Sequence, residues 1–139
     1  MDAATWVREE TAAWSSHDIE KTLSLFADDC VYEDLALGRV FRGREELRAF
    51  LKMCFTMFPD LKAEVTSFFF SGNRVCIEYI WSGTNLGDTP TMPATGKSFS
   101  VRCASIREMT GGVATRATDY YDLGTMMRQL GVQPSAPQT

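Results

Sequence analysis

The sequence predicts an α+β domain in which helices pack on one face of a curved, mainly antiparallel β-sheet. Two patterns lead to this fold class. Apolar residues recur at helical spacing through the first 58 residues, and from residue 61 onward β-branched and aromatic residues dominate four stretches separated by turn signals. The 139 residues, 45% apolar and 23% charged, suit one globular domain. We expect this domain to cover residues 1–132, followed by a flexible tail at 133–139.

Three helices are predicted ahead of the sheet. The first covers about residues 3–15, and the second begins after Asp18, a good N-cap residue, with Ile19, Leu23 and Phe26 on one side. Residues 27–29 are expected to end it. A short strand at 30–34 and a loop at 38–43 come next. The third helix, residues 44–58, has the clearest apolar periodicity of the three.

Four strands are predicted at residues 61–70, 74–81, 98–108 and 113–121. Residues 71–73 and 110–112 are tight hairpin turns, because both contain glycine between two strand-like runs. The long connection from Gly83 to Gly96 is expected to form a pocket rim. After the last strand, Asp122 is suited to cap a short C-terminal helix that ends at Gly131.

Asp119 is the residue that this pattern does not explain. Alternation along the last strand places Val113, Thr115, Ala117, Asp119 and Tyr121 on one face of the sheet. An acidic side chain beside small residues on a concave face suits a ligand pocket. The structural alternative is a surface carboxylate paired with Arg116 or Arg102.

Composition excludes several classes of protein. The net charge of −4 argues against nucleic acid or an anionic membrane surface as partner. There is no apolar run long enough to cross a bilayer and no signal-peptide pattern, so we expect a cytoplasmic protein. The four cysteines are scattered, and the single histidine, His17, lies in a predicted turn. We therefore expect no metal site, no disulfide framework and no cofactor.

The order of elements and several short motifs resemble the SnoaL-like polyketide cyclases of the nuclear transport factor two-like superfamily. The resemblance spans about residues 18–132 and rests on a set of motifs in a fixed order: Phe26–Asp29 followed by Tyr32–Asp34, Gly43–Leu47, Phe58–Leu61, Trp81–Thr84, Ala94–Lys97, and Tyr121–Leu123 followed by Gln129–Gly131. It implies a cone-shaped, mixed β-sheet wrapped around a pocket by three N-terminal helices, with a short C-terminal helix.

The resemblance also implies roles for two aspartates. Asp119 matches the acid/base aspartate of the SnoaL-like cyclases and the general base of limonene epoxide hydrolase, and Asp34 matches the base of ketosteroid isomerase. Three departures accompany these matches. Ala117 stands where the cyclases have a histidine, Tyr79 and Trp81 stand where the arginine and second aspartate of the epoxide hydrolase are expected, and Ala104 stands near the isomerase's oxyanion donor.

Two carboxylates in one apolar cavity would have separated pKa values, leaving one acid and one base. Asp34 has an equally good structural explanation as the first residue of a turn. We further expect six substrate-binding residues, although aromatic residues are usually core and a strand arginine is usually solvated: Tyr79, Trp81, Tyr32, Trp14, Phe55 and Arg102.

The predicted function is therefore that of a cofactor-independent cyclase or isomerase. It would act on a hydrophobic polyketide-, steroid- or terpenoid-like small molecule with Asp119 as general acid/base. Two alternatives stay open: an epoxide hydrolase or epoxide-opening cyclase in the same pocket, and a non-catalytic small-molecule-binding dimer. We expect a homodimer in any case, because the predicted outer face carries Phe99, Val101, Cys103 and Tyr120.

Overall fold

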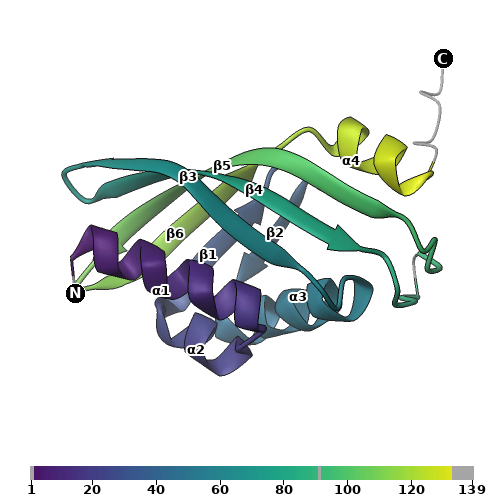
Figure 1. Cartoon of the computed structure of the whole chain (residues 1–139). Helices are drawn as coiled ribbons and strands as arrows, with labels where there is room; N and C mark the ends of the chain where they lie inside the picture. The colour runs from purple at the N-terminus through teal and green to yellow at the C-terminus, as the bar shows by residue number, and fades with distance from the viewer. Residues whose placement is uncertain (1, 91, 133–139) are drawn as a thin grey trace, which may run out of the picture.

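The computed structural model describes residues 2–90 and 92–132 (Figure 1). The elements in chain order are α1 (Ala3–Ser16), α2 (Ile19–Ser24), β1 (Phe26–Asp34), β2 (Arg39–Arg42), α3 (Gly43–Met57), β3 (Lys62–Ser71), β4 (Arg74–Thr84), β5 (Ser98–Thr110), β6 (Val113–Tyr120) and α4 (Leu123–Leu130). Within this part of the chain, the strands form one sheet in the order β2-β1-β6-β5-β4-β3. Neighbouring strands are antiparallel except β1 and β6, which are parallel. The predicted α+β class with a curved, mixed sheet is confirmed.

The helices begin and end where local chemistry favours it. Asp2, Asp18 and Asp122 cap α1, α2 and α4, each accepting a hydrogen bond from a backbone N–H of the first turn. Gly131 ends α4 with φ of 72°, a left-handed conformation that glycine adopts without strain. No helix in residues 2–90 or 92–132 is long and apolar enough to cross a membrane.

Helices α1, α2 and α3 cover one side of the curved sheet, and α4 packs on β5 near its other end (Figure 1). The space between these layers is filled by a core rich in aromatic residues. Gln129 of α4 pairs with the backbone of Ser100, accepting from its N–H at 2.7 Å and donating to its carbonyl at 3.1 Å. It thereby satisfies the backbone hydrogen-bonding groups of Ser100, which lies in the part of β5 that does not pair with β6.

The segment between α2 and α3 differs from the expectation. Phe26 and residues 27–29 belong to β1, not to α2, because backbone pairing with β6 begins at Phe26 opposite Ala114. Residues 39–42, expected as loop, form the short edge strand β2. Gly38, with φ of 68°, allows the tight reversal, and the buried ring of Phe41 stacks on Phe50 at 4.3 Å.

Strand β6 follows the predicted alternation in its second half only. The pairing of β5 with β6 shifts by one residue between Glu108 and Met109, which leaves Thr115 as the extra residue of a bulge. As a result Ala114, not Thr115, shares the buried face with Ala117 and Asp119. The bulge lies in the pairing between two strands, so residue types in one strand do not reveal it.

The expected outer face also requires correction. Phe99, Val101 and Cys103 are buried on the concave face of the sheet, where each is paired with an inward-facing position of β4. Phe99 packs edge-on against Phe58 and Trp81. Of the four residues expected to need a dimer partner, Tyr120 alone is exposed, at 43%.

Candidate active site

A cavity lies between α1, α3 and the concave face of the sheet. The space between the atoms that line it amounts to about 490 Å³, a figure that includes open solvent. Six of the thirteen residues that line it are aromatic: Trp14, Tyr32, Phe50, Tyr79, Trp81 and Tyr121. Glu10, Arg107 and Asp119 are the charged residues that line it.

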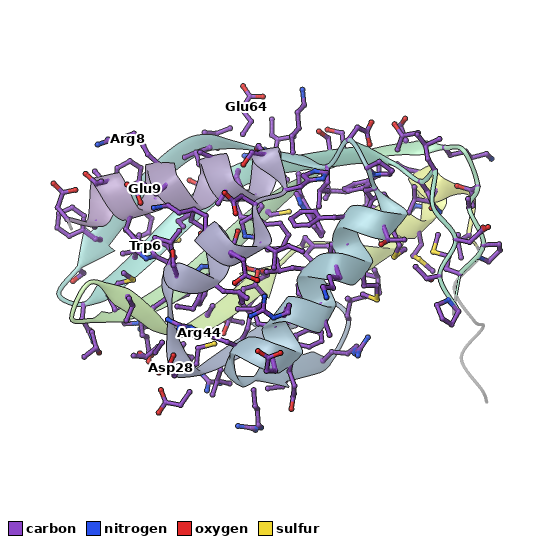
Figure 2. All side chains as sticks on the ribbon, turned by 90° about the horizontal axis from the view of Figure 1, so that it is seen from below. Trp6, Arg8, Glu9, Asp28, Arg44 and Glu64 are labelled. Atoms are coloured by element: carbon purple, nitrogen blue, oxygen red, sulfur yellow. The ribbon has the colours of Figure 1, made fainter. Side chains whose placement is uncertain are left out.

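These charges are unlike those on the rest of the helix layer. Figure 2 shows Arg8 of α1 and Glu64 of β3 on the outside of the molecule, and Glu9 of α1 is half-buried and paired with Lys21 at 2.7 Å. The Asp28–Arg44 ion pair, at 2.6 Å, is also solvent-exposed. Glu10 follows Glu9 directly, yet only 4% of it is exposed. Such a buried carboxylate requires a partner.

Asp119 is the centre of the polar network. It is 6% exposed and accepts three hydrogen bonds: from the Tyr32 hydroxyl at Oδ2, and from Ser105 Oγ at 2.6 Å and Arg107 Nη1 at 2.9 Å at Oδ1. Strand pairing places Ser105 directly opposite Asp119. These donors fix the orientation of the carboxylate toward the cavity.

Arg107 lies between two carboxylates. Besides Asp119, it contacts Glu10, whose Oε2 accepts from Nε at 3.3 Å and from Nη2 at 3.2 Å. Burial raises the pKa of Glu10, and the neighbouring guanidinium opposes that effect. Burial would lower the pKa of Arg107, but Glu10 and Asp119 raise it well above its ordinary value. The guanidinium also lies 5.3 Å from the centre of the Tyr32 ring.

A chain of hydroxyl groups extends the network across the sheet. Ser105 has one hydroxyl proton and gives it to Asp119, so Tyr79 must be the donor in the 2.9 Å contact between the Tyr79 and Ser105 oxygens. Burial, followed by the charge of Asp119, raises the pKa of Tyr32 and of Tyr79 well above the ordinary value. Both phenols therefore stay protonated near neutral pH.

Asp34 forms a second polar centre beside the first. It is paired with Asp119 across the parallel strands β1 and β6 and is 1% exposed. Its carboxylate accepts from the Tyr121 hydroxyl at 2.9 Å and from Leu37 N–H at 3.0 Å. Asp34 thus begins a turn and also contacts a cavity residue. Burial raises its pKa to about 6, and the charge of Asp119 adds to this effect.

The structure brings together most of the predicted site. Tyr79, Trp81, Tyr32 and Trp14 line the cavity with Asp119, and Asp34 reaches it through Tyr121. Phe55 does not line it, since its ring stacks on His17 at 4.2 Å and packs edge-on against Trp14 at 5.6 Å. Arg102 is exposed on the outer face of β5, which alternates with the concave face.

The connection from Gly83 to Gly96 contributes no described residue to the cavity wall. Its first part is held instead on the end of α3, where the N–H of Leu86 donates to the carbonyl of Met57 at 3.1 Å. Gly87 approaches the Thr56 carbonyl so closely that a Cβ would lie 1.8 Å from it. The first part of this connection therefore packs against α3, where a pocket rim was expected.

Sequence reasoning missed Glu10, Ser105 and Arg107. The signal for two of them was present, because the inward alternation of Phe99, Val101 and Cys103 continues to Ser105 and Arg107. Glu10 lies four residues after Trp6, which places it on the buried side of α1. The prediction assigned the apolar residues of β5 to the outer face, and Arg107 was therefore not recognised as an inward-facing residue.

The residues that the structure describes include no cluster of three or more histidine, cysteine, aspartate or glutamate side chains able to hold a metal ion.

Comparison with known proteins identifies relatives of the whole domain. The family model described as SnoaL-like polyketide cyclase matches residues 4–130. A Catenulispora acidiphila protein with a ketosteroid isomerase-like fold, solved in complex with trimethylamine, is 26% identical; the match covers 96% of this chain and 97% of that one, with a TM-score of 0.83. IdmH of Streptomyces antibioticus, a candidate polyketide cyclase, is 24% identical over 95% of this chain and 100% of its own, with a TM-score of 0.81. AclR of Streptomyces galilaeus, a candidate hydroxylase, is 20% identical over 97% of this chain and 84% of its own, with a TM-score of 0.80.

Proposed function

Because this chain belongs to the SnoaL-like polyketide cyclase family, we propose that it is a cyclase or isomerase in which Asp119 and Asp34 perform cofactor-independent acid–base catalysis. The substrate would be a hydrophobic polyketide-, steroid- or terpenoid-like carbonyl compound. One observation carries this proposal. Two buried aspartates are paired across β1 and β6: Asp119 lines the aromatic cavity, and Asp34 accepts a hydrogen bond from Tyr121 of its wall.

Asp119 is suited to be the base. A carboxylate offers about four lone-pair sites, and Tyr32, Ser105 and Arg107 occupy three of them. One site is left for a proton taken from a substrate in the cavity. The ion pair with Arg107 offsets the cost of holding a carboxylate in these surroundings.

Asp34 is suited to support the acid. While it is ionised, it accepts the Tyr121 hydroxyl proton in a hydrogen bond. Once protonated, Asp34 can donate to the Tyr121 oxygen, which frees the tyrosine O–H to donate to a substrate carbonyl. With a pKa of about 6, Asp34 exchanges this proton close to neutral pH.

In the proposed reaction, Asp119 returns the proton that it removes. Asp119 takes a proton from the carbon next to the carbonyl, and Tyr121 donates a hydrogen bond to the oxygen of the resulting enolate. In ring closure, the enolate carbon forms a bond to a second carbonyl carbon, whose oxygen receives the proton from Asp119. In isomerisation, Asp119 returns the proton to a different carbon of the same enolate.

Epoxide opening is a second candidate, favoured by one observation. Arg107 and Glu10, linked to Asp119, supply a guanidinium and a second carboxyl group. The resemblance to the epoxide hydrolase implies these two groups at the positions of Tyr79 and Trp81, which carry neither. Asp119 would take a proton from water, and the water oxygen would form a bond to an epoxide carbon. Glu10, whose pKa burial raises, would protonate the departing oxygen.

A third candidate is a protein that binds a small molecule without catalysis. With each of the three candidate functions, we propose that the protein is a homodimer. Tyr120 and Phe69 project from the outer face of the sheet, with 43% and 62% of their surfaces exposed. A second copy of the chain would cover them.

The test of catalysis is deuterium exchange. NMR would follow incorporation of solvent deuterium next to the carbonyl of polycyclic enones and β-polyketones. We expect Asp119→Asn to fold normally and to lose at least about 100-fold in exchange rate. Asp122→Asn, which alters an exposed capping residue, should keep the wild-type rate. Full exchange by Asp119→Asn would refute the base assignment, and ¹⁸O from water in a diol product would favour epoxide opening.

A further inference from the structure

The polar groups around the cavity carry an excess of negative charge. The guanidinium of Arg107 contacts two buried carboxyl groups, those of Glu10 and Asp119, and a third buried carboxyl group, that of Asp34, lies beside Asp119 across β1 and β6. Arg107 is the one cationic side chain among the described residues that line the cavity. A buried charge without compensation is unfavourable, so this arrangement favours a further positive charge from outside the protein.

The hydroxyl protons around the cavity already have acceptors within the protein. Tyr32 donates to Asp119, Tyr79 to Ser105, and Tyr121 to Asp34. Thr11, at the wall formed by α1, donates to the Val7 carbonyl at 2.8 Å. While Asp34 is ionised, these hydroxyls therefore present oxygen lone pairs to a guest. An anionic guest would find few donors, whereas a guest with N–H groups or positive charge would find acceptors.

The aromatic wall supplies the complementary surface. The rings of Trp14 and Trp81 are nearly perpendicular, at 87° with centroids 6.3 Å apart. Tyr121 continues this arrangement at 63° to Trp81, with centroids 5.7 Å apart. In such edge-to-face contacts the edge of one ring meets the face of its neighbour, and all three residues line the cavity. Indole and phenol faces attract cations, most strongly where water is excluded.

We propose that the substrate of this cavity carries a compact cationic group, a protonated or quaternary amine, which binds among Trp14, Trp81 and Tyr121 and is balanced by Asp119. The inference rests on the proposed function in one respect, that this cavity is the substrate site. It narrows the substrate class from hydrophobic carbonyl compounds to amine-bearing ones. The ammonium group also offsets the negative charge that develops on an enolate.

Three small ligands with nearly the same carbon frame and different charges test the inference. They are choline, 3,3-dimethylbutan-1-ol and 3,3-dimethylbutanoate. Binding would be measured by calorimetry and by tryptophan fluorescence, to which Trp14 and Trp81 contribute, at pH 7.5 and low salt. We expect choline to bind about tenfold more tightly than the neutral alcohol and the carboxylate to bind most weakly. Equal or tighter binding of the alcohol, or no binding of choline, would overturn the inference.

Variants assign the effect to the site. Asp119→Asn should weaken choline binding by about tenfold and leave alcohol binding unchanged, whereas the exposed Asp122→Asn should leave both unchanged. If Asp119→Asn does not fold by circular dichroism, the wild-type comparison of choline with the alcohol decides alone. Preference for the alcohol would reject the cationic substrate and leave the acid–base role intact, because deuterium exchange tests that role separately.

Discussion

Arg107 and Asp119 form a buried ion pair across neighbouring strands, with Nη1 and Oδ1 2.9 Å apart and both side chains less than a tenth exposed. The same guanidinium holds Glu10 on its other side. Helix α1 and strands β5 and β6 are thereby joined at the wall of the cavity. The candidate site and the packing of the N-terminal helix depend on one side chain.

Replacing Arg107 by methionine should be severely destabilising. The substitution keeps much of the volume but leaves two buried carboxylates without their partner, so we expect a loss of about 3–5 kcal/mol in the free energy of unfolding. Urea denaturation measures it. The matched control is Arg102→Met on the exposed face of β5, which should change stability by less than about 0.5 kcal/mol. Similar losses for the two variants would contradict the role given to the ion pair.

Asp34 should reduce stability at neutral pH, because the folded protein raises its pKa from 3.8 to about 6. Between these values the folded state holds a proton that the unfolded state has released, so stability falls as pH rises from about 4 to 6. Above pH 6 the full difference applies, on the order of 3 kcal/mol for a shift of about two pH units. Asp34→Asn should therefore be more stable than wild type at pH 7.5.

This gain should shrink as the pH falls from about 6 toward 4 and should vanish only well below 3.8, where Asp34 is protonated in the unfolded state as well. Thermal unfolding of the two proteins from pH 4 to 8 gives the comparison, with the exposed Asp29→Asn as control. A gain that does not vary with pH would indicate that burial of the charge is not its cause.

The pH dependence of turnover follows from the same aspartate. If protonated Asp34 releases the Tyr121 hydroxyl toward the substrate, kcat/KM should decrease by about tenfold per pH unit above pH 6. In Asp34→Asn the amide N–H donates at every pH, so this decrease should disappear. An unchanged alkaline limb in the variant would exclude Asp34 as its source.

The proposed dimer can be tested on the outer face of the sheet. Tyr120→Arg places a charge on a residue that is 43% exposed and points away from the cavity. If this face joins two copies, light scattering at micromolar concentration should give a dimer for wild type and a monomer for the variant. A wild-type monomer, or a dimer that survives the substitution, would show that this face does not join two copies.

The sequence contains enough information for the fold and for part of the site. Strand alternation correctly predicts an inward-facing Asp119, because that half of β6 is regular. The same rule fails at Thr115, where the bulge depends on the pairing with β5. Arg107 and Glu10 are 97 positions apart, and each looks like a surface residue alone. Their shared burial becomes visible only when α1 lies across the sheet.

Ser105→Ala should uncouple Tyr79 from Asp119. The serine oxygen links the two groups at 2.9 and 2.6 Å, so its removal leaves the partly buried Tyr79 hydroxyl without its acceptor. An unsatisfied buried hydroxyl costs about 1–3 kcal/mol, which urea denaturation would detect. Because Tyr79→Phe removes the same hydroxyl, Ser105→Ala should cost less in that background. The two losses should therefore combine to less than their sum in a double-mutant cycle. Additive losses would mean that the Tyr79–Ser105 hydrogen bond contributes nothing in solution.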